Sequence, residues 1–412
     1  MDISRRKFIL VGSTWAGVTL LAAAGCTGST APGNTASNQT LPENQDSQPK
    51  AEPAVAAARR GMLLGPGGRK TASGMEFFLA MINLDHIDRY VAGELKAGLI
   101  PMAFRGHAVV PHPVERSRAV IFEKWGPGAC EVDLKTLQSL RTVAPSKADR
   151  HFYGHGAWSL DGNLLYAVES EDRAKGAYDG FIIIRDAKTM EVKGEFPTFG
   201  KLPHDCHILD QGRTLAITNG GGALGSKDLG CVTFVDIASQ KLIEKVTLPE
   251  TLMAGHLAIT ARWRKGELAI GSTPQERAGM SPDDYKKLPG GLSLRSHGRE
   301  LITLGAPQEV TSRMLGETLS LAIHEGRGIV GATNPAGNIV TFWDVKEGKH
   351  LKSFDFNLAR GIAVTLDQKY FVVAYGSETS IVLIDAQTLE LQGQTKLSPT
   401  GISGSHVAMY DI

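Results

Sequence analysis

The sequence predicts an all-β protein with the architecture of a seven-bladed β-propeller. Two sequence landmarks recur at intervals of roughly fifty residues, and a period of about 40 to 50 residues is typical of propellers. No long amphipathic helical pattern interrupts them, so four-stranded antiparallel blades are the simplest structure that explains the repeat.

The first landmark is a strand that runs into a Gly/Asp turn and a second apolar strand, as in residues 154–167, 203–216 and 360–371. Turn residues of this kind join antiparallel strands. Aligning the landmark gives one column, whose members follow one another at steps of 43 to 62 residues: His107, His155, His204, His256, Thr318, Gly361 and His406. Seven members predict seven blades.

The second landmark is a β-rich strand that ends in Asp and is followed by a polar turn. It occurs at Asp133, Asp186, Asp236, Asp344 and Asp385. The last member of the column lies only six residues before Ile412, so residues 404–412 are expected to form an inner strand completed by strands from about Met75 to Pro101. Pairing of the C-terminal strand with N-terminal strands would close the sheet ring and remove its free edges.

The first 26 residues are typical of an export signal. Residues 4–10 contain a twin-arginine motif, an apolar stretch follows, and residues 23–26 resemble a lipobox that ends at Cys26. We expect a lipoprotein anchored through Cys26 in the periplasm, with no other membrane contact. Ala23 stands where a lipobox usually has Leu, so simple cleavage remains an alternative, as does an uncleaved anchor.

Residues 27–60 are rich in small and polar residues and predict a disordered tether, and residues 61–412 predict the propeller domain. The net charge is +1 and no basic stripe is present, which argues against a nucleic-acid partner. We expect a monomer. Three cysteines beside Cys26 are too few and too scattered for a disulfide scaffold.

Five of the seven column positions are His, although the chain has only 12 histidines. The first strand of a propeller blade lines the central channel, and imidazole is the commonest metal ligand, so the column predicts a metal site. A ring of this width should not place all five imidazoles on one ion. A subset binding one metal, a metal cluster and a larger cofactor are the alternatives, with copper or iron favoured over zinc.

Further candidates lie near the same positions. His151, Cys206 and His207 are secondary metal ligands, and strand alternation should place His204 and Cys206 on one face and His207 on the other. Arg105, Arg150 and Arg360 precede column positions and are candidate rim or anion-binding residues. Thr318 and Gly361 should leave the histidines as an open arc, with an approach route beside Arg360.

Several segments resemble a known family, the twin-arginine-exported bacterial propellers of domain of unknown function 1513. They are residues 105–107 with 111–113, 150–155 with 161–162, 194–198 with 203–204, 218–221, 255–258 and 342–344. Gly255 departs from the family, which usually has Arg before the fourth histidine. The resemblance implies a periplasmic role and a partner in iron uptake or a haem-containing redox protein, because members are often encoded beside such proteins.

The leading functional hypothesis is a periplasmic metal-binding propeller that serves metal uptake or a redox step. Two alternatives remain open at this level. One is a non-catalytic scaffold whose blade surfaces bind a partner. The other is an enzyme that acts on a small organic anion in the channel mouth, with histidine as acid or base and arginines as clamps.

Overall fold

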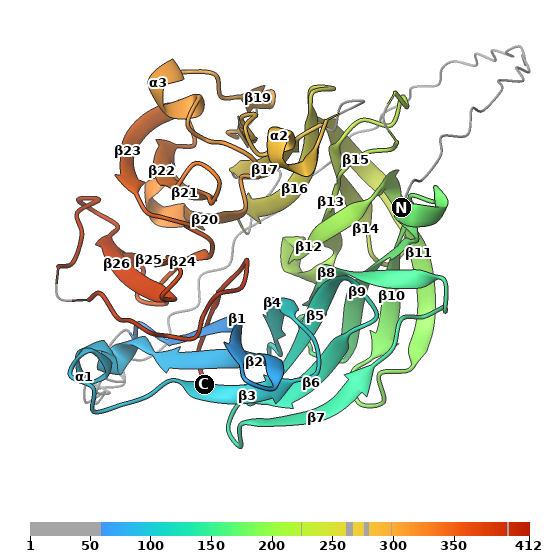
Figure 1. The fold of residues 1–412 in the computed structure, drawn as a ribbon. Helices are drawn as coiled ribbons and strands as arrows, with labels where there is room; N and C mark the ends of the chain where they lie inside the picture. Colours follow the sequence, from blue (N-terminus) through green and yellow to red (C-terminus); the bar gives the residue numbers. More distant parts are fainter. Residues whose placement is uncertain (1–58, 224, 261–266, 276–279, 298, 394) are drawn as a thin grey trace, which may run out of the picture. The chain divides into compact units, whose positions relative to one another are not determined.

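The computed structural model describes residues 59–412 except positions 224, 261–266, 276–279, 298 and 394 (Figure 1). The predicted export signal with Cys26 and nearly all of the predicted tether therefore lie outside the described residues. Within the described residues, no helix has the length and apolarity needed to cross a membrane. The all-β class predicted from the sequence is confirmed, since the described elements are 27 strands and a few helices of one turn or so.

The strands of the N-terminal half form three runs of neighbours in the chain. The first run is β1 (Met62–Thr71), β2 (Gly74–Asn83) and β3 (Gly98–Met102). The second is β4 (Gly106–Pro111), β5 (Arg118–Gly126), β6 (Ala129–Asp133) and β7 (Gln138–Val143). The third is β8 (Arg150–Trp158), β9 (Leu164–Glu171), β10 (Asp179–Asp186) and β11 (Val192–Lys201).

The C-terminal half continues the same pattern. Two further runs are β12 (Pro203–Leu209), β13 (Thr214–Asn219), β14 (Cys231–Asp236) and β15 (Lys241–Thr247), then β16 (Leu252–Ile259), β17 (Leu268–Pro274), β18 (Gly291–Arg295) and β19 (Ile302–Thr303). The last strands are β20 (Ser320–His324), β21 (Ile329–Asn334), β22 (Ile339–Asp344), β23 (Lys349–Asp355), β24 (Ile362–Val364), β25 (Tyr370–Tyr375), β26 (Ser380–Asp385) and β27 (Ala408–Tyr410).

Short helices lie in the connections. The α-helices are α1 (Ile87–Val91), α2 (Pro282–Tyr285) and α3 (Gln308–Thr311). The 3-10 turns are η1 (Leu84–His86), η2 (Arg173–Lys175), η3 (Asp210–Gly212) and η4 (Glu325–Arg327). Helix α2 begins after Ser281, whose hydroxyl accepts a hydrogen bond from the Asp284 amide.

Consecutive strands pair antiparallel within each run. The β4–β7 and β8–β11 runs are joined into one sheet of eight strands by pairing of β5 with β8. The first strands of successive runs also contact one another in turn, from β4 through β8, β12, β16, β20 and β24 to β27, and β27 contacts β4. The sheets therefore follow one another around their first strands (Figure 1).

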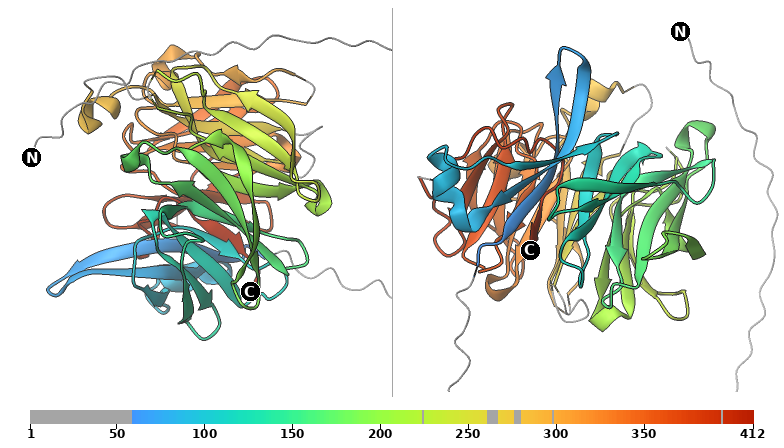
Figure 2. Two further views of the ribbon diagram at one scale, coloured as in Figure 1. Left: turned by 90° about the vertical axis from the view of Figure 1, so that its right-hand side faces the viewer. Right: turned by 90° about the horizontal axis from the view of Figure 1, so that it is seen from below.

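The C-terminal strand completes the N-terminal sheet, as expected. β27 pairs with β1 through Leu64 and Ala408, Leu63 and Met409, and Met62 and Tyr410. The sheet begins earlier than the predicted Met75, because β1 forms a hairpin with β2 over its whole length. In both views of Figure 2 this hairpin extends beyond the neighbouring strands.

The apolar core consists of seven clusters of buried side chains, and each cluster draws on two successive runs of strands. Phe122 and Phe152, for example, meet between the β4 and β8 runs, with ring centroids 5.3 Å apart. One cluster joins Leu63 and Phe78 of the first run to Ile381 of the last. The first and last runs are thus held together by apolar packing as well as by the β1–β27 ladder.

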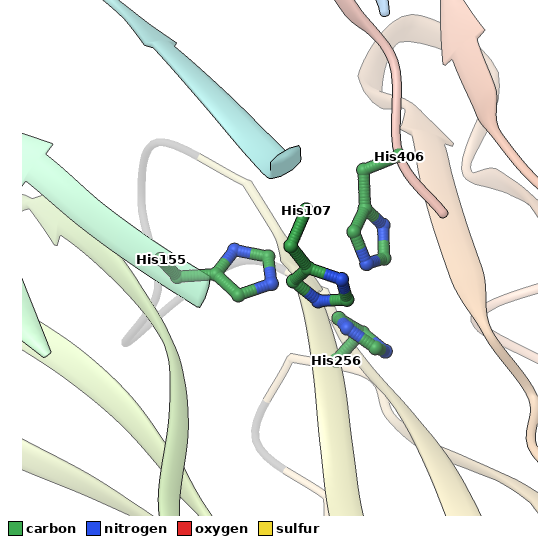
Figure 3. Close-up of side chains that lie close together, drawn as sticks. All are labelled: His107, His155, His256 and His406. Carbon is green, nitrogen blue, oxygen red and sulfur yellow. The ribbon is translucent and has the colours of Figure 1, made fainter. Parts of the chain in front are cut away.

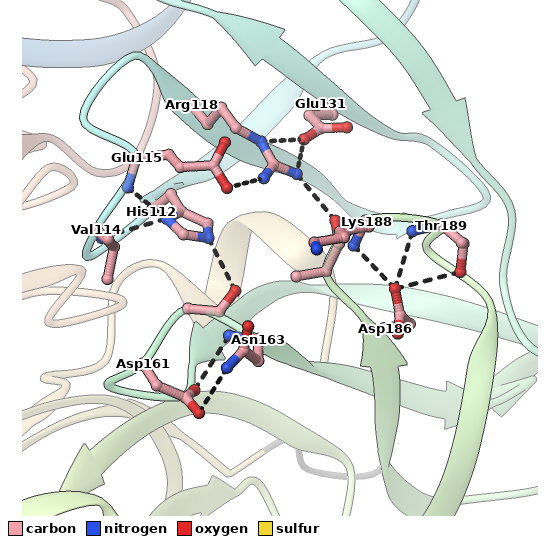
Figure 4. A network of polar contacts seen from close by, with 12 residues as sticks. His112, Val114, Glu115, Arg118, Glu131, Asp161, Asn163, Asp186, Lys188 and Thr189 are labelled. Atoms are coloured by element: carbon pink, nitrogen blue, oxygen red, sulfur yellow. Dashed lines mark hydrogen bonds and ion pairs between the residues drawn. The ribbon is translucent and has the colours of Figure 1, made fainter.

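The strand-end aspartates of the second landmark stabilise the turns that follow them. The Asp186 carboxylate accepts hydrogen bonds from the backbone amides of Lys188 (2.9 Å) and Thr189 (3.0 Å), as Figure 4 shows. The other four landmark aspartates accept from turn amides in the same way: Asp133, Asp236, Asp344 and Asp385. Side-chain capping of a turn explains the regular recurrence of Asp.

His112 also has a structural role. Its Nε2 donates to the Gly162 carbonyl (2.9 Å), so its Nδ1 accepts from the amides of Val114 (3.2 Å) and Glu115 (2.8 Å) (Figure 4). The buried ring thereby holds the β4–β5 connection against the β8–β9 turn.

Removal of the closing strand should destabilise the domain. We expect a variant truncated after Val407 to lose about 2 to 4 kcal/mol of unfolding free energy, because Met409 and Tyr410 lose their packing and β1 loses a partner. Urea denaturation followed by circular dichroism measures this loss. Asp411→Asn, which removes only half-exposed ion pairs, should change the midpoint little. Equal midpoints for the truncated and unaltered chains would contradict the closing role of β27.

Candidate metal centre

Each of the four inner strands that carry a column histidine has a register shift beside that histidine. The shifts lie between Gly106 and Ala108 in β4, Phe152 and Gly156 in β8, Pro203 and Cys206 in β12, and Ala254 and His256 in β16. A β-bulge leaves a residue out of the ladder and redirects its side chain. The bulges therefore turn the imidazoles toward a common point.

The backbone groups freed by two of these bulges are paired through one side chain. Thr218 Oγ1 accepts a hydrogen bond from the Asp205 amide (2.8 Å) and donates to the Gly255 carbonyl (2.6 Å). Gly154 permits another close approach, because a Cβ at this position would lie 2.3 Å from Cδ2 of His107. Its φ of +100° also suits glycine rather than any larger residue.

The five imidazoles form one compact cluster. Neighbouring ring centroids are 5.0 Å apart for His107 and His155, 4.8 Å for His155 and His204, and 4.3 Å for His204 and His256. His107, His155, His204 and His256 are each at most 8% exposed. Figure 3 shows four of the rings pointing toward one another.

The cluster is closed and not the open arc expected from the sequence. The His256 and His406 rings are 4.1 Å apart, and the His406 and His107 rings are 4.6 Å apart. Thr318 does not leave a gap beside them, because its hydroxyl accepts a hydrogen bond from Asn334. Ser320 takes the neighbouring place instead, with its Oγ 3.4 Å from Nδ1 of His406.

A buried carboxylate orients His155. Asp205 Oδ1 lies 3.0 Å from Nδ1 of His155, and Oδ2 accepts from Nε2 of His207 (3.1 Å) and from the Leu257 amide (3.1 Å). Burial opposes ionisation of this carboxyl, but the facing histidines outweigh it and lower its pKa well below the usual range. With Nδ1 donating to Asp205, the lone pair of His155 is on Nε2.

A chain of hydrogen bonds orients His204 and His256. Nδ1 of His204 donates to the Tyr153 carbonyl (3.0 Å), so its Nε2 is the acceptor in the 2.6 Å contact with Nε2 of His256. His256 is therefore protonated on Nε2 and carries its lone pair on Nδ1.

Six buried imidazole nitrogens have no hydrogen-bond partner among the described residues, and four of them belong to the cluster: Nε2 of His107, Nε2 of His155, Nδ1 of His256 and Nε2 of His406. The other two are Nδ1 of His151 and Nδ1 of His324. Buried polar atoms are rarely left unpaired, and an unpaired group often indicates an ion. One ligand nitrogen from each of the same four residues lies within 4.8 Å of the others.

This arrangement fits a transition metal. Nitrogens bound at about 2.0 to 2.1 Å lie between about 3 and 4.2 Å apart, so the rings must move closer together around a bound ion. A second set of His204, His256 and Glu317 also offers one ligand atom each within the same limit. Glu317 Oε1 lies 3.8 Å from Nδ1 of His256 and so borders the first set. A buried histidine cluster that can hold a metal is thus present, with a subset of the column forming its centre.

The environment keeps the imidazoles neutral. Burial is the main cause that lowers the pKa of His107, His204, His256 and His406 well below 6.5. Positive charge adds to this effect, chiefly from Lys124 at His204 and from neighbouring histidines at the other three. A neutral imidazole has the free lone pair that a metal requires.

The secondary candidates lie outside the four converging nitrogens. The bulge in β12 breaks the predicted alternation, so Cys206 packs among apolar side chains while Asp205 and His204 face the cluster. Burial raises the pKa of the Cys206 thiol well above its usual range. His207 contacts Asp205, which in turn contacts His155, so His207 does not reach the converging rings directly. His151 lines an adjoining cavity with Trp125 and Tyr153.

The three candidate arginines are placed differently. Arg150 is buried, forms an ion pair with Glu195 (2.6 Å) and lies over the Phe181 ring. Arg105 is exposed and lines a cavity of about 500 Å³ that also reaches His107 and His204. Arg360 lies near Arg105, since burial and then the charge of Arg105 lower its pKa. Only Arg105 and Arg360 therefore lie near the cluster.

Asp205, Glu317, Ser320 and Lys124 belong to this site but were not candidates from the sequence. Asp205 lies inside the His204–His207 segment, and a carboxylate between two histidines could have indicated a supporting group. Glu317 lies directly before Thr318 and Ser320 lies two residues after it. Thr318, the column member, therefore identified this segment of the chain, but not the two residues that contact the histidines. Lys124 carries no local signal, because it reaches the site through the β5–β8 pairing.

Acid should destabilise the metal-free protein. Four cluster histidines have a lower pKa in the folded than in the unfolded chain: His107, His204, His256 and His406. Below a pH of about 6.5 the unfolded chain therefore binds more protons than the folded chain, and the free energy of unfolding falls as the pH falls. Each such proton contributes up to about 1.4 kcal/mol per pH unit. Urea midpoints measured between pH 7.5 and 5.0 with chelator present test this trend.

The matched control is the double variant His107→Gln, His256→Gln, which keeps polar side chains that do not titrate. Its stability should depend less steeply on pH over the same range. A slope as steep as that of the unaltered chain would show that the cluster histidines already bind protons in the folded state.

The comparisons with known proteins concern the fold and the family. No curated protein matches this sequence. A chain of the solved structure titled Kuenenia stuttgartiensis Hydrazine Synthase is similar in fold, with a TM-score of 0.56 and 14% identity over 84% of this chain and 100% of that chain. Residues 100–400 match the family model described as protein of unknown function (DUF1513). Because the match spans most of the sequence, the chain belongs to this family.

Proposed function

We propose that the sheets form a seven-bladed β-propeller. Seven runs of consecutive antiparallel strands, counting β27 with β1–β3, support this architecture. The first strands contact one another in a closed series, and one apolar cluster lies between each pair of successive runs. In such a fold the histidine cluster lies where the inner strands meet.

We further propose that the protein binds one transition metal ion through His107, His155, His256 and His406. The observation that carries this proposal is that one ligand nitrogen of each of these four buried histidines lies within 4.8 Å of the other three, and that each ring has a buried nitrogen with no hydrogen-bond partner among the described residues. Asp205 orients His155, and His204 orients His256, in the manner of outer-shell partners of metal ligands.

We propose copper or iron as the metal. Neutral imidazoles suit both, and copper(II) stands highest among divalent metals in affinity for such ligands. Zinc is less favoured, because its closed sites usually contain cysteine thiolates and its open sites usually have three protein ligands. Cys206, the nearest thiol in the sequence, packs among apolar residues. A bound copper or iron ion would supply Lewis-acid or one-electron chemistry at this point.

We propose that the protein works in the periplasm as a lipid-anchored monomer, in metal uptake or in a redox step with an iron-uptake or haem-containing partner. The twin-arginine motif in residues 4–10 and the lipobox-like segment that ends at Cys26 support export and anchoring. Twin-arginine export carries folded proteins, which suits a buried centre assembled before export.

Metal content tests the centre directly. Protein purified from the periplasm should contain about one equivalent of copper or iron by elemental analysis. The double variant His155→Ala, His256→Ala removes two of the four converging nitrogens and should lose nearly all of it. His324→Ala is the matched control, because His324 is buried but donates to the Gln368 carbonyl (2.7 Å) away from the cluster.

Two outcomes would contradict a metal function. Metal retained undiminished in the double variant would place it elsewhere in the chain. A folded unaltered protein that takes up neither copper nor iron from solution would favour a non-catalytic scaffold.

Asp205→Asn tests the supporting carboxylate. Loss of its charge weakens the hydrogen bond that orients His155, so the metal affinity should fall about 10- to 100-fold while the protein stays folded. Competition with a chromophoric chelator measures the affinity. Asp161→Asn, an exposed turn residue, should leave it unchanged. An unchanged affinity in Asp205→Asn would remove Asp205 from the centre.

A further inference from the structure

The cavity that reaches His107 and His204 has walls of two kinds. Its charged side chains are Arg105, Lys124, Arg173, Glu123 and Glu317, and its flat or apolar ones include Trp125, Tyr153 and Met253. Its volume of about 500 Å³ lies within the range of small-molecule sites. A ligand in this cavity would lie directly beside the histidine cluster.

The charges in this cavity favour an anion. Three cations face two carboxylates, and the Glu123 carboxylate already accepts a hydrogen bond from the Gly128 amide (3.0 Å). Arg105 forms no ion pair or hydrogen bond with the described residues, and Lys124 lies 3.7 Å from Glu317. Arg105 is therefore available to hold a carboxylate, and the Lys124 ammonium, which contacts Glu317, has further N–H donors for the same ligand.

The same cations are unfavourable for a bare metal ion. Arg105 and Lys124 line the same cavity as His107 and His204, so their positive charge would repel a metal cation bound there. An anion in the cavity would offset that repulsion. Metal and anion should therefore each increase the affinity of the other.

Trp125 provides the flat surface. It lies at the irregularity where β5 pairs with β8, has a φ of +62° and is 54% exposed at the edge of the cavity. A bulky residue in the left-handed region is strained, and such strain clusters at ligand sites. The indole ring contacts the Tyr153 ring, with centroids 5.7 Å apart, and the Arg173 guanidinium lies 5.4 Å from its centroid.

We propose that this cavity binds a planar organic carboxylate, with its carboxylate on Arg105 and Lys124 next to the histidine cluster and its flat body against Trp125. The inference deepens the proposed function, because it names the ligand class of the same site. The coupling of this anion to a metal rests on the proposed function, whereas its binding in the cavity does not.

Benzoate is the probe, and benzamide, its neutral analogue of nearly the same shape, is the matched ligand. Binding to the full chain is measured by isothermal titration calorimetry and tryptophan fluorescence, after chelation and after loading with one equivalent of Cu²⁺. Benzoate should bind both forms, more tightly when copper is present, and at least about tenfold more tightly than benzamide.

Three variants test the assigned contacts. Arg105→Gln should lower benzoate affinity at least about tenfold, whereas Arg213→Gln, an exposed arginine elsewhere, should not. Trp125→Leu should weaken benzoate binding but leave the affinity for acetate unchanged. The copper content of Arg105→Gln should equal that of the unaltered chain, which separates loss of the anion site from loss of the metal site.

Benzamide binding as tightly as benzoate, or unchanged benzoate affinity in Arg105→Gln, would overturn the proposal. So would the absence of benzoate binding at millimolar concentration. Benzoate binding in a protein that takes up no metal would support the cavity assignment and reject the metal centre.

Discussion

The burial of five imidazoles at one point constrains the rest of this structure. A charged imidazole without water is costly there, and burial lowers the pKa of His107, His204, His256 and His406, so the N–H groups of the cluster need acceptors. Protein groups meet this need at three rings: Asp205 at His155, the Tyr153 carbonyl at His204, and His204 itself at His256. Each of these contacts fixes which nitrogen of the ring donates and which one keeps the lone pair.

The β-bulges are the backbone device that makes this convergence possible. Regular strands would send successive side chains to alternate faces and keep the rings apart. A bulge beside each of the four strand-borne histidines gives up a ladder hydrogen bond, and Thr218 pairs the groups freed in β12 and β16. The four bulges all lie beside the column histidines of the inner strands. Bulges interrupt the ladder without improving apolar packing, so their clustering at the histidines indicates a functional centre.

The charges around the cluster complement its donors. Lys124 and Arg105 border the cavity side, and Asp205 lies beneath His155 on another side. Four neutral nitrogens can hold a cation, yet the nearby lysine and arginine favour an anion. A metal together with an anionic ligand satisfies both, which is why the two proposals concern one site.

The sequence by itself determined the strand pattern, the repeat and the histidine column. The turns at Asp161 and Asp186 depend on contacts within a few residues of the chain, so the sequence predicts them. Burial of alternate residues in a strand gives an alternation of apolar and polar residues that is visible in the sequence. The tertiary structure alone decided which nitrogens meet. The bulge in β12 shifts the register, so Asp205 enters the site while Cys206 turns away. Ser320, at the start of β20, contacts His406, whereas the Thr318 hydroxyl bonds to Asn334. Lys124 in β5 and Glu317 before β20 belong to runs that are not neighbours, and only the closed arrangement of the inner strands brings them within 3.7 Å of each other. Side-chain periodicity carries no information on such contacts, because they depend on how separate sheets pack.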